Sequence, residues 1–184
     1  MHILMCNDDG ILADGLRHLA SYLSQYYRIT VVAPANEQSA KSHALTTEVP
    51  LKLDACNGED ENPRLYALTG TPSDCMKFGL SYLLADDMPD LVISGINHGF
   101  NLGSDVLYSG TVSAAMESGF YGIPGLALSV ERYSVERGDE MHPFIHELIE
   151  KIYVAGQFSG LLNVNFPLRG TCDWDHFKMV SQIG

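Results

Sequence analysis

Short apolar runs alternate with segments of helical periodicity along this 184-residue chain, and this alternation limits the folds open to it. Continuous apolar runs are typical of strands buried on both faces, as in a parallel sheet covered by helices. Strands are expected over residues 1–5, 28–34, 47–55, 63–70, 90–97, 124–130, 161–167 and 177–183. Helices are expected over residues 16–27, 74–85, 111–122 and 142–155.

This order of elements predicts an α/β fold, a Rossmann-like three-layer α/β/α arrangement around a mostly parallel sheet. With 46% hydrophobic residues, the chain has enough apolar side chains for one compact core. It shows no internal repeat and no linker composition, so we expect a single domain over residues 1–184. In such sheets, ligands bind where strands end at their carboxyl edge.

Charge and composition exclude several classes of partner. The formal net charge is −12 and the isoelectric point is about 4.8, which argues against a nucleic acid polymer. A small anionic substrate remains compatible if a cation or backbone amides offset the field. No stretch is long enough to span a membrane. The four cysteines have no metal-like spacing, so reduced thiols and a cytoplasmic location are expected.

Two adjacent acids, Asp8 and Asp9, follow the first expected strand and precede Gly10. One interpretation is that they cap the next helix, since Asp accepts bonds from free helix N–H groups. A single Asp is enough for that, however, and the pair costs repulsion. Carboxylate oxygens are suited to Mg²⁺ or Mn²⁺, so a bound divalent cation is the alternative.

A Gly-rich segment after the strand over residues 90–97 holds further polar candidates. Asn97 ends that strand, where its amide oxygen can serve either as another metal ligand or only within the turn. Asn101 has the same two interpretations. Ser109, Gly110 and Thr111 precede an Ala-rich helix, where free N–H groups make an anion site. Most such sequences are ordinary Ser/Thr caps, but Gly110 favours the anion site because a missing Cβ lets phosphate approach the backbone.

Two other protein classes fit parts of this pattern. Haloacid-dehalogenase-type phosphatases need a second acid at position 10, which is Gly10 here. A response-regulator receiver needs a phosphorylatable Asp at the end of a middle strand, where this chain has Asn97. His43 and His98 lie in the same polar loops, and His98, beside Asn97, is the better candidate for a substrate contact.

Taken together, the motifs NDDGILADG, LTGTPSDC, SGINHGFNLGSDVLYSGTVSAAMES and NVNFP, with the loop around Ser39, resemble the SurE survival-protein family. The likeness covers residues 1 to about 167 in matching order. The family consists of divalent-metal-dependent nucleotidases that act on nucleoside 5′- and 3′-monophosphates. The resemblance implies one divalent cation per subunit, Mg²⁺ or Mn²⁺, bound by Asp8, Asp9, Ser39 and Asn97.

The resemblance also places Asn101, Ser109, Gly110 and Thr111 in the phosphate-binding region. Two features depart from the family pattern: Ala40 replaces a usual glycine, and residues 35–38 replace the usual arginines of that loop. Family chains continue into a C-terminal extension that helps to build the oligomer, whereas this chain stops at Gly184. A homodimer or tetramer is compatible with the resemblance.

The resulting hypothesis is hydrolysis of a nucleoside monophosphate, with a metal-oriented water as the nucleophile and Asp8 or Asp9 as the general base. The amides around Ser109 to Thr111 would hold the phosphoryl oxygens. Two alternatives remain open: a non-catalytic, receiver-like domain that senses phosphate or nucleotide, and an exopolyphosphatase. Free-phosphate measurements separate all three.

Overall fold

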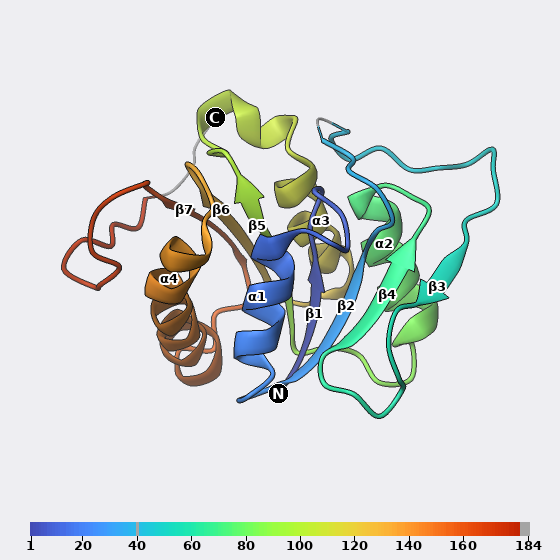
Figure 1. Cartoon of the computed structure of the whole chain (residues 1–184), viewed down its shortest axis with the longest axis horizontal. Helices are drawn as coiled ribbons and strands as arrows, with labels where there is room; N and C mark the ends of the chain where they lie inside the picture. The colour runs from blue at the N-terminus through green and yellow to red at the C-terminus, as the bar shows by residue number, and fades with distance from the viewer. Residues whose placement is uncertain (40, 181–184) are drawn as a thin grey trace.

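The computed structural model describes residues 1–39 and 41–180, and within them one sheet forms the centre of the molecule (Figure 1). Its strands lie in the order β3-β4-β2-β1-β5-β6-β7. All neighbouring pairs are parallel except β3 with β4. The strands are β1 (His2–Cys6), β2 (Arg28–Pro34), β3 (Leu53–Ala55), β4 (Arg64–Leu68), β5 (Leu91–His98), β6 (Gly125–Val130) and β7 (Leu161–Phe166).

Helices cover both faces of the sheet, which confirms the three-layer α/β/α prediction. On one face, α1 (Asp14–Leu23) packs against α4 (Val135–Leu148), which continues into the π-helical η4 (Ile149–Ala155). On the other face, α2 (Pro72–Phe78) packs against α3 (Gly110–Glu117). The remaining short helices are η1 (Gly79–Leu83), η2 (Gly103–Leu107) and η3 (Ser118–Tyr121).

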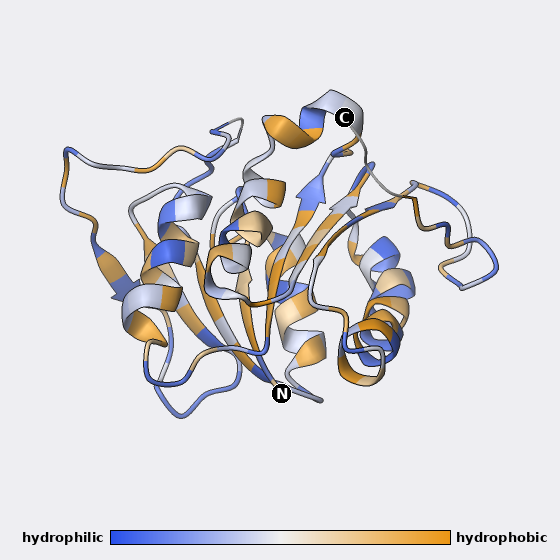
Figure 2. Ribbon diagram, turned by 180° about the vertical axis from the view of Figure 1, so that it is seen from behind, coloured by the Kyte–Doolittle hydropathy of each residue, from blue (hydrophilic) through white to orange (hydrophobic). Residues whose placement is uncertain are grey.

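The central strand β1 explains why its sequence is apolar at every position. Ile3 and Met5 point into the core under α1 and α4, whereas Leu4 and Cys6 point into the core under α2 and α3. Successive side chains of a strand alternate between faces, so a strand covered on both sides needs apolar residues throughout. Figure 2 shows the central strands of the sheet mostly in hydrophobic colours.

Three predicted elements differ from the structure. The helix expected from residue 142 begins at Val135, where the Ser134 side chain caps it, so Pro143 lies inside α4. The strand expected over residues 47–55 is confined to β3. Residues 177–180 form no strand, and the rest of the strand expected there lies outside the described residues, as do Ala40 and Gly184.

The strand order fixes where a ligand would bind. The chain runs from β1 to β2 and β4 on one side, and β5 then pairs with the other side of β1. The connections therefore diverge between β1 and β5, and ligand sites of open α/β sheets lie at such a point, beyond the carboxyl ends of the strands. Cys6 is paired with Ser94, so Asp8, just after β1, and Asn97, near the end of β5, lie at similar heights. No helix within the described ranges has the length and apolar character to cross a membrane.

Candidate metal and phosphate site

A tight loop after β1 presents the two aspartates. The buried Asn7 closes it: Asn7 Oδ1 accepts a hydrogen bond from the Gly10 N–H, and Asn7 Nδ2 donates to the Gly10 carbonyl, both at 3.1 Å. Gly10 has a φ of +100°, and an added Cβ would lie 3.3 Å from the Pro34 carbonyl oxygen. Glycine is therefore required there. Asn7 was missed in the sequence, although an Asn before a turn is a known signal.

The helix-cap interpretation of Asp8 and Asp9 is wrong. Helix α1 has Ala13 at its N-cap, with no side-chain hydrogen bond there, and its first-turn acid is Asp14. Asp8 instead contacts a different helix, 103 residues later in the chain. The Thr111 hydroxyl donates a 2.7 Å hydrogen bond to Asp8 Oδ1, and both side chains are buried.

Gly110 allows this contact between β1 and the first turn of α3. A Cβ at Gly110 would lie 3.0 Å from both Cβ and Oδ2 of Asp8, so a side chain there would push the carboxylate away. Burial raises the pKa of Asp8, and the hydrogen bond from Thr111 opposes this rise. The structure therefore brings Asp8, Gly110 and Thr111 of the predicted site together.

Asp9 lies in a second acidic environment. Burial, followed by the negative charges of Asp8 and Glu37, raises the pKa of Asp9 to about 6, while His98 opposes the rise. Glu37 is therefore a third acid of this edge, and it was missed because an acid in a polar loop carries no distinguishing signal. Ser39 joins the same group, since its hydroxyl donates a 2.7 Å hydrogen bond to Glu37 Oε1.

The β2 loop is fixed to the β1 loop by the main chain, because the Gln38 N–H donates a 2.7 Å hydrogen bond to the Asp8 carbonyl. This bond brings the Ser39 segment beside the acids. Ser39 is exposed.

Asn97 reaches the same edge through an irregularity in β5. Between Ser94 and Asn97, β5 gains one residue relative to β6, and such bulges redirect side chains beside functional sites. Asn97 Nδ2 donates to the Gly99 carbonyl at 2.8 Å, and no residue of the described ranges donates to its Oδ1. That oxygen is therefore available to a ligand.

A hard divalent cation fits this donor set. Neither Asp8 nor Asp9 forms an ion pair with a cationic side chain in residues 1–39 and 41–180, and both pKa values are raised. In those same ranges, no three His, Cys, Asp or Glu side chains are grouped as a metal site. Neutral oxygens, such as those of Ser39 and Asn97, are the kind of ligand that can add to the two carboxylates.

Asn101 and Ser109 have local structural roles. Asn101 is buried, its Nδ2 donates to Ser129 Oγ at 2.8 Å, and its carbonyl accepts hydrogen bonds from Asn163 and Asn165. These bonds fasten the loop after β5 to β6 and β7. Ser109 Oγ accepts a 3.1 Å hydrogen bond from the Val112 N–H and caps α3. A phosphate contact by either residue stays a prediction.

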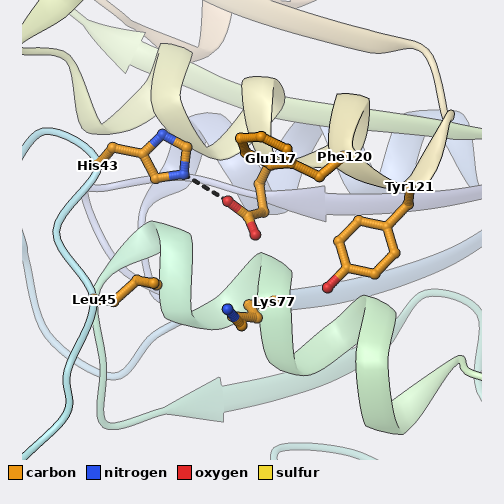
Figure 3. Close-up of a pocket in the computed structure, with 6 residues that line it drawn as sticks. All are labelled: His43, Leu45, Lys77, Glu117, Phe120 and Tyr121. Carbon is orange, nitrogen blue, oxygen red and sulfur yellow. Dashed lines mark hydrogen bonds and ion pairs between the residues drawn. The ribbon is translucent and has the colours of Figure 1, made fainter.

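Cavities lie beside α2 in two places among the described residues. The larger, of about 580 Å³, lies between α2, η3 and the end of α3, where His43 donates a 2.5 Å hydrogen bond to the buried Glu117 (Figure 3). His43 is thus a structural partner. The smaller cavity, of about 250 Å³, lies at the carboxyl ends of β2 and β4.

Comparisons with known proteins find relatives that match most of this chain. A relative from Thermoanaerobacter sp. (strain X514), named 5′-nucleotidase SurE, is 49% identical over 91% of this chain and 66% of its own length. A protein of the same name from Caldanaerobacter subterraneus is 48% identical over 90% of this chain and 65% of its own. The chain thus spans about two thirds of the length of these relatives.

A solved structure has the same fold. The crystal structure of SurE protein from Aquifex aeolicus matches with a TM-score of 0.77 and 37% identity, over 91% of this chain and 66% of that one. The family model described as survival protein SurE matches residues 3–184. The chain therefore belongs to the SurE survival-protein family.

Proposed function

We propose that this chain is a metal-dependent phosphomonoesterase that hydrolyses nucleoside 5′- and 3′-monophosphates to nucleoside and phosphate. The observation that carries this proposal is the contact of the Asp8 carboxylate with Gly110 and Thr111, because it sets an acidic loop against a helix N-terminus. The acidic loop favours a cation and the helix N-terminus favours an anion, and a metal-bound phosphoester needs both. The name 5′-nucleotidase carried by the relatives supports the same substrate class.

Asp8, Asp9, Ser39 and Asn97 would hold one divalent cation, Mg²⁺ or Mn²⁺. When bound, such an ion supplies positive charge for the phosphoryl oxygens and lowers the pKa of water. Thr111 keeps the Asp8 carboxylate oriented, and the loop around Asn7 keeps both acids at the sheet edge.

The protein's own groups supply the remaining chemistry. The Gly110 and Thr111 N–H groups at the start of α3 bind the non-bridging phosphate oxygens, and Gly110 lets the Asp8 carboxylate lie close beside them. The Asp8–Asp9 pair accepts a proton from the attacking water. A P–O bond forms to that water, the ester P–O bond breaks, and the leaving nucleoside oxygen takes up a proton.

One experiment tests the proposal. The chain is incubated with nucleoside monophosphates and Mn²⁺ or Mg²⁺, and free phosphate is measured, with EDTA as the control. Asp8→Asn should reduce turnover on the order of 100-fold or more, as loss of one preorganised electrostatic contact does. Asp60→Asn, the same change at an exposed position remote from the acids, should have no effect.

The outcome also separates the two alternatives. Binding of nucleotide without phosphate release would indicate a sensing domain, and release from polyphosphate alone would indicate an exopolyphosphatase. Activity that is equal with EDTA and with metal would contradict the proposal. Single-domain organisation, a homodimeric or tetrameric state and a cytoplasmic location are further proposals, and light scattering of the purified chain tests the oligomeric state.

A further inference from the structure

The smaller cavity adjoins the acidic loop. We call it the β2–β4 cleft, because its walls are residues that follow β2, residues at the end of β4 and the start of α2, and part of the segment over residues 46–49. Gln38 lines it, and the Gln38 N–H donates to the Asp8 carbonyl at 2.7 Å. Asn36, another lining residue, has its carbonyl carbon 3.4 Å from where a Gly10 Cβ would lie.

The strand order gives the direction from the acids to the cleft. β2 lies between β1 and β4, and neighbouring strands are about 4.8 Å apart, so the cleft is centred roughly 7 Å from β1. A phosphoester whose phosphate lies beside Asp8 can therefore extend its organic group over the ends of β2 and β4.

The residues that line the cleft are uncharged, and two of them, Asn36 and Gln38, carry amide side chains. Neither the Asn36 nor the Gln38 side chain has a hydrogen-bond partner within the described ranges, and each can both donate and accept. Leu68 and Val49 supply apolar surface. A nucleobase has a neutral, planar ring with donors and acceptors on its edge, and Asn and Gln are the side chains that commonly pair with such edges.

The walls of the cleft are fixed before any ligand binds. Asp74, itself buried, accepts hydrogen bonds from the Thr46 N–H at 2.9 Å and the Thr46 hydroxyl at 2.6 Å. The Thr71 hydroxyl donates to the Ala44 carbonyl at 2.7 Å. These threonines are therefore used by the fold, which leaves recognition to Asn36 and Gln38. Preformed walls lower the entropic cost of binding.

The larger cavity fits this ligand less well. Glu117 and Lys77 line it, and both carry charges that a neutral base does not need (Figure 3). Glu117 is the last residue of α3, whereas Gly110, which contacts Asp8, is the first. Seven residues of helix separate them by about 10 Å.

We propose that the β2–β4 cleft is the nucleoside subsite, in which Asn36 and Gln38 hydrogen-bond the base of the substrate whose phosphate lies at Asp8. This inference rests on the proposed function and goes beyond it by naming the residues that select nucleoside monophosphates among phosphomonoesters. Asn36 and Gln38 are thus specificity residues.

The test compares two substrates that differ only in the base. With adenosine 5′-monophosphate and ribose 5-phosphate, the ratio of their kcat/KM values should fall about tenfold in Asn36→Ala and again in Gln38→Ala, the size of one lost hydrogen bond each. Gln25→Ala removes an exposed amide near the opposite edge of the sheet and should leave the ratio unchanged. An unchanged ratio in both cleft variants would overturn the proposal.

A binding measurement distinguishes this proposal from the catalytic one. Adenosine, which has no phosphate to release, should bind the wild-type chain in calorimetry about a hundredfold more tightly than the Asn36→Ala, Gln38→Ala double variant. If no phosphate is released from any substrate but this difference holds, the proposed function fails and the subsite stands. Equal adenosine affinity in both chains, or no binding to either, would refute the subsite.

Discussion

Among single residues, Asp8 connects the two halves of the site. It is the buried member of the acid pair, and it contacts residues that a sequence reading places in the phosphate region. The acids and Asn97 are recognisable as candidates because they are polar residues at the ends of buried strands, and the Ser109–Thr111 turn because it precedes a helix. The hydrogen bond from Thr111 to Asp8 cannot be recognised in the sequence, because 103 residues separate the two and only the fold brings them together.

The Thr111 hydroxyl is the first residue to test. Thr111→Val keeps the buried shape but removes the donor to Asp8 Oδ1, so Mn²⁺ affinity and turnover should fall roughly 10–100-fold, as for other residues that orient a metal ligand. Thr111→Ser keeps the hydroxyl and should retain most of both. Calorimetric Mn²⁺ titration measures this, and equal affinity in the valine and serine variants would count against the orienting role.

Gly110 provides a steric test of the same contact. In Gly110→Ala the new Cβ would lie 3.0 Å from Asp8 Cβ and Oδ2, so the carboxylate must move, and we expect Mn²⁺ affinity to fall about tenfold or more. Gly119→Ala is the matched control, because a Cβ there meets no atom within 4 Å among the described residues. Equal Mn²⁺ affinity in both alanine variants would show that the close approach is unimportant.

At the level of elements, periodicity predicts the strands and the helices that cover them. It does not predict the caps, loops and bulges at their ends. The start of α4 depends on the Ser134 cap, and a proline inside the helix hides this start from the pattern. Glu37 acts on Asp9 from a different loop, and the bulge in β5 depends on pairing with β6. Neither has a local sequence signal, because each is decided by a neighbour distant in the chain. Asn7, by contrast, closes its own turn on Gly10, and that local signal was missed.

The packing of α4 on α1 makes a pH-dependent prediction. His142 on α4 is buried beside Tyr22 on α1, and burial, with a contribution from His18, lowers the pKa of His142 from 6.5 to about 4 despite the opposing charge of Asp139. The unfolded chain therefore binds a proton more readily than the folded one between these values. Stability should fall as the pH is lowered from about 6.5 toward 4.

His142→Phe should make the thermal midpoint less sensitive to pH over this range, since the ring is kept and the titrating group is lost. Gln25→Ala, which removes no titrating group from an exposed position, should leave the pH dependence as in the wild-type chain. Melting curves at several pH values provide the measurement. The same slope in His142→Phe and wild type would show that another group is responsible.

For the whole molecule, the net charge of −12 acts against an anionic substrate. The Debye length falls from roughly 30 Å at 0.01 M salt to about 8 Å at 0.15 M, so added salt screens this repulsion. At saturating Mn²⁺, kcat/KM for a nucleoside monophosphate should therefore rise severalfold with salt. Steady-state kinetics at constant pH measure the effect, and a decrease would mean that a local positive field outweighs the net charge.

The position of the metal ion is the most direct test. Crystals of the chain grown with Mn²⁺ and measured at the manganese absorption edge should show an anomalous peak between the Asp8 and Asp9 carboxylates. Asn97 Oδ1 and the Ser39 hydroxyl should point toward that peak. A well-occupied Mn²⁺ elsewhere in the molecule, with no peak at the acid pair, would contradict the account.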